Sequence, residues 1–145
     1  SPSRRGPKVS ELILDCSVAM AWCFEDEASA ACDAVLDRVR DGGAIVPALW
    51  FWEVGNVLAM AQRRGRISES ACAVRLNLLS ALPIRTDDIG PAKAWNETRL
   101  LAQSQILSVY DAAYLELALR QGGVLATKDK ALNLAANRLG IETLP

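Results

Sequence analysis

The sequence predicts an α/β domain built on a parallel β-sheet. Short apolar segments typical of strands alternate with longer segments in which apolar residues recur at helical spacing. Glycines follow several of the helical segments and favour helix ends there, at Gly42, Gly65, Gly122 and Gly140. Alternating strands and helices are the pattern of a parallel sheet whose crossovers are helical.

The expected elements follow one another in a regular order along the chain. Strands are expected over 12–15, 44–47, 83–86, 123–127 and 142–144. Helices are expected over 28–40, 49–64, 68–82, 91–103, 111–121 and 128–139. Two helices stand between the second and third strands, and Ser68 is suited to cap the second of them. The architecture is therefore not one helix per strand.

Length and composition limit the classes of protein to consider. A chain of 145 residues fits one compact domain, which we expect over residues 11–145. Residues 1–10 are polar and basic and are expected to be a disordered lead-in or an expression remnant. No apolar stretch approaches the roughly 20 residues that a membrane span requires, so we expect a soluble protein.

The four cysteines do not form a metal-binding or redox pattern. They lack paired short spacing, and the chain has no histidine to complete a zinc site. Buried free thiols in a reducing cytoplasm are therefore expected for Cys16, Cys23, Cys32 and Cys72. The net charge of −1 does not indicate a nucleic-acid binder, but arginines cluster at one helix end. They either complement the helix dipole or contact phosphate.

Four carboxylates stand where the predicted elements would direct them inward. Asp15 closes the first strand and Asp129 follows the fourth, so these two would meet if those strands are neighbours. Glu53 and Asp111 would join them from the first turns of two helices above the same edge. In open parallel sheets, ligands bind at this carboxyl edge.

Three of the acids have a structural explanation when each is taken alone. Asp15 could cap the turn that follows it, and Asp111 could complete a capping box with Ser108. Asp129 could complement the dipole of a helix capped by Thr127. These alternatives remain open from the residues alone.

Glu53 has the weakest structural explanation, because its neighbours along the helix are mostly apolar. Burying a lone carboxylate costs several kcal/mol. Asn56 lies nearly one turn later and could hold the Glu53 carboxylate or face the same pocket. An ion pair between Glu53 and an arginine is the structural alternative.

Four acids at one edge would repel one another. Two unit charges about 4 Å apart at an effective dielectric constant of 20 repel by roughly 4 kcal/mol, against a net domain stability of about 5–15 kcal/mol. Protonation or a divalent cation has to offset this repulsion. Because the candidate ligands are all oxygen atoms, Mg²⁺ or Mn²⁺ suits the site better than zinc or copper.

Four segments of the chain resemble, in order, the motif blocks of PIN-domain nucleases, and most closely those of VapC-type toxins of toxin–antitoxin modules. These segments are Leu14–Val18, Trp52–Leu58, Tyr110–Ala118 and Leu125–Leu132. The resemblance implies a three-layer α/β/α sandwich with a parallel sheet of four to five strands and a Mg²⁺-dependent ribonuclease site. It gives the catalytic and metal-binding roles to Asp15, Glu53, Asp111 and Asp129. It gives supporting roles to Ser17, Asn56 and Thr127.

An acidic pocket also needs cations at its rim to bind an RNA backbone. The candidates are Arg63, Arg64, Arg66, Lys128 and Lys130. The resemblance further implies a cognate antitoxin, a homodimer and a toxin–antitoxin hetero-oligomer in the cytoplasm, without membrane contact. The tryptophans Trp22, Trp50 and Trp95 could line such an interface or belong to the core.

Two other functions remain as alternatives. A PIN-like protein could act mainly through protein complexes, or as a free-standing RNA-processing nuclease without an antitoxin. A phosphatase of the haloacid-dehalogenase type also places an aspartate after the first strand, but it needs a second acid two residues later. Ser17 stands at that position, which disfavours the phosphatase.

Overall fold

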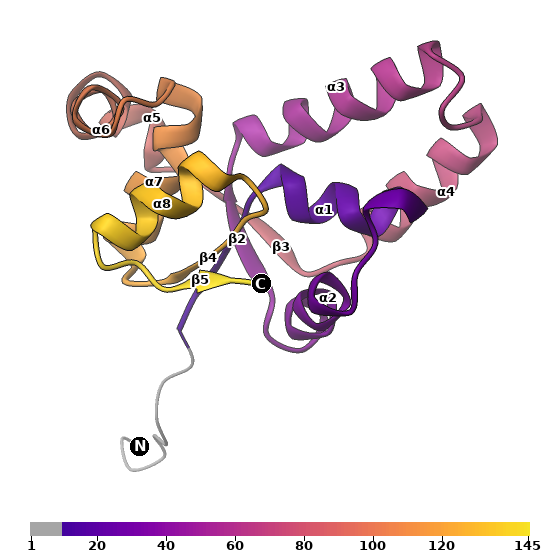
Figure 1. Cartoon of the computed structure of the whole chain (residues 1–145), viewed down its shortest axis with the longest axis horizontal. Coiled ribbons are helices and arrows are strands. Elements are labelled where there is room, and N and C mark those ends of the chain that lie inside the picture. Colours follow the sequence, from indigo (N-terminus) through magenta and orange to yellow (C-terminus); the bar gives the residue numbers. More distant parts are fainter. Residues whose placement is uncertain (1–9) are drawn as a thin grey trace.

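A computed structural model describes residues 10–145, so the lead-in expected over 1–10 lies almost wholly outside the described residues (Figure 1). Five parallel strands form one sheet in the order β3-β2-β1-β4-β5. They are β1 (Leu12–Leu14), β2 (Ala44–Pro47), β3 (Ile84–Asp87), β4 (Val124–Ala126) and β5 (Thr143–Leu144). The predicted α/β class with a parallel sheet is confirmed.

Helices cover the sheet and match the predicted segments closely. They are α1 (Cys16–Cys23), α2 (Ala30–Gly42), α3 (Leu49–Arg63), α4 (Glu69–Ser80), α5 (Gly90–Lys93), α6 (Arg99–Gln105), α7 (Val109–Gln121) and α8 (Lys130–Arg138). A 3₁₀ turn, η2 (Glu25–Glu27), precedes α2, and a π-helical turn, η3 (Ala94–Thr98), joins α5 to α6. The single helix expected over 91–103 is therefore three consecutive helical pieces.

Helix α1 was not predicted, because it has no polar face. Six of its eight residues are buried, so its apolar residues show no helical periodicity in the sequence. It begins directly after β1, with Asp15 as the residue at the junction. This abrupt change from strand to helix holds Asp15 at the carboxyl edge of the sheet.

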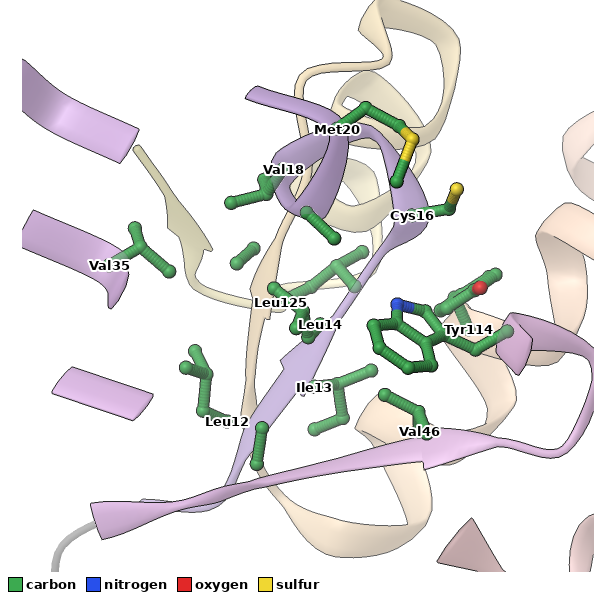
Figure 2. Packing of buried hydrophobic residues seen from close by; sticks show 14 of the residues in the cluster. Leu12, Ile13, Leu14, Cys16, Val18, Met20, Val35, Val46, Tyr114 and Leu125 are labelled. Atoms are coloured by element: carbon green, nitrogen blue, oxygen red, sulfur yellow. The ribbon is translucent and has the colours of Figure 1, made fainter. Parts of the chain in front are cut away.

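The central strand β1 is buried on both faces. Figure 2 shows Leu12 on the side of Val35 from α2, whereas Ile13 points toward Val46 and Tyr114. Helix α7, which carries Tyr114, contacts β1, β2 and β4 on that side. Helices therefore pack on both faces of the sheet, in the predicted three-layer arrangement.

Helices α3 and α4 form an antiparallel arm that projects from one end of the molecule (Figure 1). Gly65 turns the chain at its tip with a φ of 74°, a region that favours glycine. Ser68 caps α4, as predicted, and accepts a hydrogen bond of 3.1 Å from the backbone N–H of Ala71. Within residues 10–145, no helix is both long and apolar enough to cross a membrane.

Candidate functional site

Asp15 is held by hydroxyl groups from two different elements. Its Oδ2 accepts a hydrogen bond of 2.6 Å from Ser17 Oγ in α1 and one of 2.8 Å from Thr127 Oγ1 after β4. The two sides meet because β1 pairs with β4, with Leu14 opposite Ala126. Asp15 is 7% exposed, and among the described residues no side chain donates to its Oδ1. One oxygen of Asp15 is thus fixed by hydroxyl groups from two elements.

The same hydroxyls also hold the loop between β4 and α8. Ser17 Oγ accepts from the backbone N–H of Lys128 at 2.8 Å, and Thr127 Oγ1 accepts from the N–H of Asp129 at 3.0 Å. Asp129 is itself the N-cap of α8, because its Oδ1 accepts from the N–H of Leu132 at 2.9 Å. The capping role that the sequence offered to Thr127 therefore belongs to Asp129.

Asp111 lies in the first turn of α7. Ser108 caps this helix by accepting a hydrogen bond of 3.0 Å from the N–H of Asp111, which is one of the two hydrogen bonds of the expected capping box. Burial raises the pKa of the Asp111 carboxyl, and the charges of Asp129 and Asp15 raise it further. A hydrogen bond from Ser108 acts in the opposite direction. Asp111 therefore lies at a capped helix start and also close to Asp129 and Asp15.

Glu53 is hydrogen-bonded to Tyr114, which the sequence reasoning did not single out. Tyr114 is fully buried, lies one turn after Asp111 on α7, and donates its hydroxyl hydrogen to Glu53 Oε1. Burial raises the pKa of the Glu53 carboxyl, Asp15 and Asp111 raise it further, and the Tyr114 hydrogen bond lowers it. Burial and Glu53 raise the pKa of Tyr114, so its hydroxyl stays a donor.

Glu53 does not pair with the residues that the sequence suggested as its partners. Asn56 is exposed, and neither it nor any described arginine hydrogen-bonds the Glu53 carboxylate. The i, i+3 spacing of Asp111 and Tyr114 was the available signal for the tyrosine, because it places both side chains on one helix face. The polar partner of Glu53 thus comes from the same helix as Asp111.

The four acids gather in one region at the carboxyl edge of the sheet. Glu53 interacts electrostatically with Asp15 and Asp111, and Asp111 interacts with Asp15 and Asp129. Within residues 10–145, however, no three acid, cysteine or histidine side chains form a ready-made metal site. Nearby Cys16 is a neutral thiol, because burial and the charges of Glu53 and Asp15 raise its pKa to about 12. The available donors are therefore carboxylate oxygens, which suit a hard divalent cation.

Two of the predicted RNA-binding cations are engaged by acids of the protein itself. Arg66 Nη2 lies 3.0 Å from Asp26 and 2.8 Å from Glu27, and its guanidinium sits 3.8 Å from the ring centroid of Phe24. Lys128 Nζ lies 3.8 Å from a Glu27 carboxylate oxygen and donates to the Glu27 carbonyl at 3.3 Å. These contacts connect the loop around η2 to the α3–α4 turn and to the loop between β4 and α8.

The other three candidates are exposed. Arg63 and Arg64 end α3, where positive charge complements the helix dipole. Ten residues of helix, about 15 Å, separate Arg63 from Glu53. Lys130 opens α8, directly after Asp129. Of the three, Lys130 lies nearest in sequence to an acid of the site.

A buried ion-pair network that the sequence reasoning missed joins α7 to the end of β3. Arg120 donates to both carboxylate oxygens of Asp87 at 2.8 and 2.7 Å and to both of Glu116 at 2.8 Å. Asp87 also accepts from the N–H groups of Ile89 and Gly90. Only the i, i+4 spacing of Glu116 and Arg120 was visible in the sequence.

Removing one of the crowded charges is expected to stabilise the ligand-free protein. A carboxyl whose pKa is raised in the fold stabilises the protein at low pH, and this contribution is lost as pH rises through the raised pKa. Glu53→Gln and Asp111→Asn should therefore raise the melting temperature at pH 7 by a few degrees, and much less near pH 4. Glu142→Gln, at an exposed acid, should change neither value. A lower melting temperature for both site variants at pH 7 would show that the acids are not under repulsion.

Solved structures share this fold along most of their length. PAE2754 from Pyrobaculum aerophilum has a TM-score of 0.67 and 25% identity, with 94% of this chain and 92% of that chain covered. FitAcB from Neisseria gonorrhoeae has a TM-score of 0.64 and 16% identity, with 92% and 96% covered. VapC20 from Mycobacterium tuberculosis, described as a sarcin–ricin loop cleaving toxin, has a TM-score of 0.59 and 13% identity, with 86% and 95% covered.

The sequence itself carries the family signal. No protein of curated function matches the chain in sequence. Residues 12–137, however, match the model of the PIN domain, and this match includes all four acids. The protein therefore belongs to the PIN-domain family, with a fold of the VapC type.

Proposed function

We propose that the protein is a divalent-metal-dependent endoribonuclease that acts as the toxin of a type II toxin–antitoxin pair. The gathering of Asp15, Glu53, Asp111 and Asp129 at the carboxyl edge of the sheet carries the proposal. Membership of the PIN-domain family supports nuclease chemistry, and the likeness to a toxin that cleaves the sarcin–ricin loop supports RNA as the substrate. Crowded carboxylates with few neutralising cations are of no structural advantage and are expected where a metal binds.

The donor set fits Mg²⁺ or Mn²⁺. Asp15 would bind through Oδ1, because Oδ2 already accepts two hydroxyl hydrogens. Glu53 and Asp111 would complete the inner ligands, and Asp129 would contribute the oxygen that does not cap α8. When bound, the ion lowers the pKa of a water molecule and neutralises charge on the phosphodiester.

The surrounding side chains would have separate roles in hydrolysis. Glu53 would orient the attacking water from its place beside the ion. Tyr114 fixes the orientation of Glu53 through its hydroxyl. Attack by water in line with the leaving oxygen gives products with 5′-phosphate and 3′-hydroxyl ends. Ser17 and Thr127 keep Asp15 in place throughout.

Tyr114→Phe tests the support that α7 gives to Glu53. Loss of the hydroxyl leaves Glu53 Oε1 without its donor, so we expect roughly tenfold weaker Mn²⁺ binding by calorimetry. Tyr110→Phe is the matched control, because it removes the hydroxyl of an exposed tyrosine on the same helix and should bind Mn²⁺ like the parent. Equal Mn²⁺ affinity in all three proteins would contradict the role of Tyr114.

Cleavage of RNA by the purified protein tests the proposed reaction. We expect cleavage of total RNA with Mg²⁺ or Mn²⁺, and none after the metal is chelated. Coexpression with the neighbouring open reading frame should give a complex in which cleavage is suppressed. Cleavage that no copurifying partner suppresses would favour a free-standing nuclease, and a stable complex without cleavage in either state would favour a protein that acts only by binding.

Protein partners and compartment belong to the same proposal. Exposed apolar side chains on η3 and around α6, among them Trp95 at 85% and Ile106 at 90% exposure, support a homodimer or antitoxin interface there. Trp50 instead belongs to the core, and Trp22 is half-buried and donates its indole N–H to the Cys32 carbonyl. Four buried free cysteines support a reducing cytoplasm.

A further inference from the structure

A small apolar cavity lies at the carboxyl edge of the sheet, and it shares helices α3 and α7 with Glu53 and Asp111. It has a volume of about 260 Å³ and is bounded by the last residues of β2 and β3, Pro47 and Asp87. Its walls come from α5, η3 and the N-terminal parts of α3 and α7. The cavity therefore opens at the same edge of the sheet that carries Asp15.

The two carboxylates that line the cavity already accept hydrogen bonds from within the protein. Asp87 and Glu116 reach the cavity, and all four of their carboxylate oxygens accept hydrogen bonds from Arg120. The remaining lining is mostly apolar, with Leu49 and Val109 among the larger side chains. A charged ligand would gain no ion pair there, whereas a flat, neutral group would bury apolar surface.

Exposed aromatic residues immediately precede two of the acids in the chain. Tyr110 lines the cavity, is 68% exposed and immediately precedes Asp111. Trp52 immediately precedes Glu53 and is 73% exposed. A phosphodiester held by the acids would thus bring its neighbouring bases within reach of aromatic faces, on which unpaired bases stack.

Two of the candidate RNA-binding cations already form ion pairs within the protein, which increases the importance of contacts with the RNA bases. Arg66 and Lys128 are engaged by Asp26 and Glu27, so neither is available for phosphate without breaking an ion pair. Of the five candidate cations, Arg63, Arg64 and Lys130 remain exposed for phosphate, and uncharged contacts would add to the affinity for RNA. The cavity and its tyrosine supply such contacts at the site of reaction.

We propose, building on the proposed ribonuclease function, that this cavity receives one unstacked base of the RNA substrate, next to the cleaved bond, with Tyr110 stacking on it. The site then selects unpaired RNA, because a base within a duplex cannot enter the cavity. A base turned into the cavity also fixes which phosphodiester lies at the acids. Cavity binding and metal binding are separate properties of the site.

The test compares variants that change the cavity without changing the acids. Tyr110→Ala removes the stacking ring, Tyr110→Phe keeps it, and Ala113→Leu fills the cavity from its α7 wall. Each is placed in the Asp15→Asn background, and its affinity for a short single-stranded RNA that the parent cleaves is measured by fluorescence anisotropy. We expect Tyr110→Ala and Ala113→Leu to bind roughly 5- to 100-fold more weakly, and Tyr110→Phe to bind unchanged.

An RNA with an abasic residue identifies the contact as base stacking. Moving the abasic residue through the positions around the cleaved bond should weaken binding at one position, and this loss should disappear in Tyr110→Ala. Outside the Asp15→Asn background, melting temperatures and Mn²⁺ affinities of the cavity variants should match those of the parent. A parent that cleaves RNA while every cavity variant binds RNA equally well overturns the base pocket alone. A parent that cleaves no RNA overturns the proposed function and the pocket together.

A protein segment is the other occupant that this cavity could hold. If Tyr110→Ala and Ala113→Leu release a coexpressed partner but leave RNA affinity and cleavage unchanged, the cavity serves that partner and the proposal is wrong. If both RNA binding and the abasic effect are lost as described, the proposal holds whether or not a partner also covers the cavity.

Discussion

Asp15→Asn is expected to reduce RNA cleavage by on the order of 10³-fold while the fold stays intact. Asparagine has nearly the same shape, and its carbonyl oxygen can still accept from Ser17 and Thr127. It lacks the negative charge that a divalent cation requires. Single-turnover cleavage rates at saturating Mg²⁺, with melting temperatures measured on the same samples, check both parts of this expectation.

Asp88→Asn is the matched control for Asp15→Asn. Asp88 directly follows β3 at the same edge of the sheet, but it is exposed and does not contribute to the raised pKa values of Glu53 and Asp111. Its cleavage rate should equal that of the parent. If Asp15→Asn cleaves as fast as Asp88→Asn, the acids do not form the catalytic site.

Arg120→Met is expected to cause the largest loss of stability among single substitutions outside the apolar core. The side chains of Asp87 and Glu116 are 3% and 8% exposed, so removal of Arg120 would leave two buried carboxylates without a cation. Breaking a buried ion pair from one side costs about 3–5 kcal/mol, which lowers the melting temperature by roughly 10 °C or more. Thermal unfolding followed by circular dichroism measures this effect.

Arg40→Met provides the comparison for Arg120→Met. Arg40 pairs with Asp37 at 3.6 Å on the surface, and such pairs contribute about 0–1 kcal/mol. Arg120 holds the pKa of Asp87 below its ordinary value, so the stabilisation by this pair is present at neutral pH and is lost as pH falls through the lowered pKa. The difference between parent and Arg120→Met should therefore shrink in acid. Equal stability of the two variants at pH 7 would contradict the network.

The features that the sequence predicted are those that depend on order along the chain. Asp15 and Asp129 were expected to meet because they follow parallel strands, and the pairing of β1 with β4 brings their elements together. The strand segments, the helix ends at Gly65 and Gly122, and the cap at Ser68 are likewise local signals. The proximity of Asp15 and Asp129 depends, beyond these local signals, on β1 and β4 being neighbours in the sheet.

The features that were missed depend on contacts between distant residues. Tyr114 reaches Glu53 across 61 positions, and Arg120 reaches Asp87 across 33. Arg66 stood in a cluster of arginines typical of phosphate contact, yet two acids 40 and 39 positions earlier engage it. Side-chain partners of this kind leave no periodic pattern in a single sequence, so they appear only once the chain is folded.

The product ends of RNA cleaved by metal-stripped and metal-restored protein test the central claim most directly. Water activated at an acidic metal site gives 5′-phosphate and 3′-hydroxyl ends. We therefore expect these ends alone, only after Mg²⁺ or Mn²⁺ is restored. Cleavage that persists in the metal-stripped protein, or products that end in 2′,3′-cyclic phosphate, would contradict a metal-dependent hydrolytic site built from the four carboxylates.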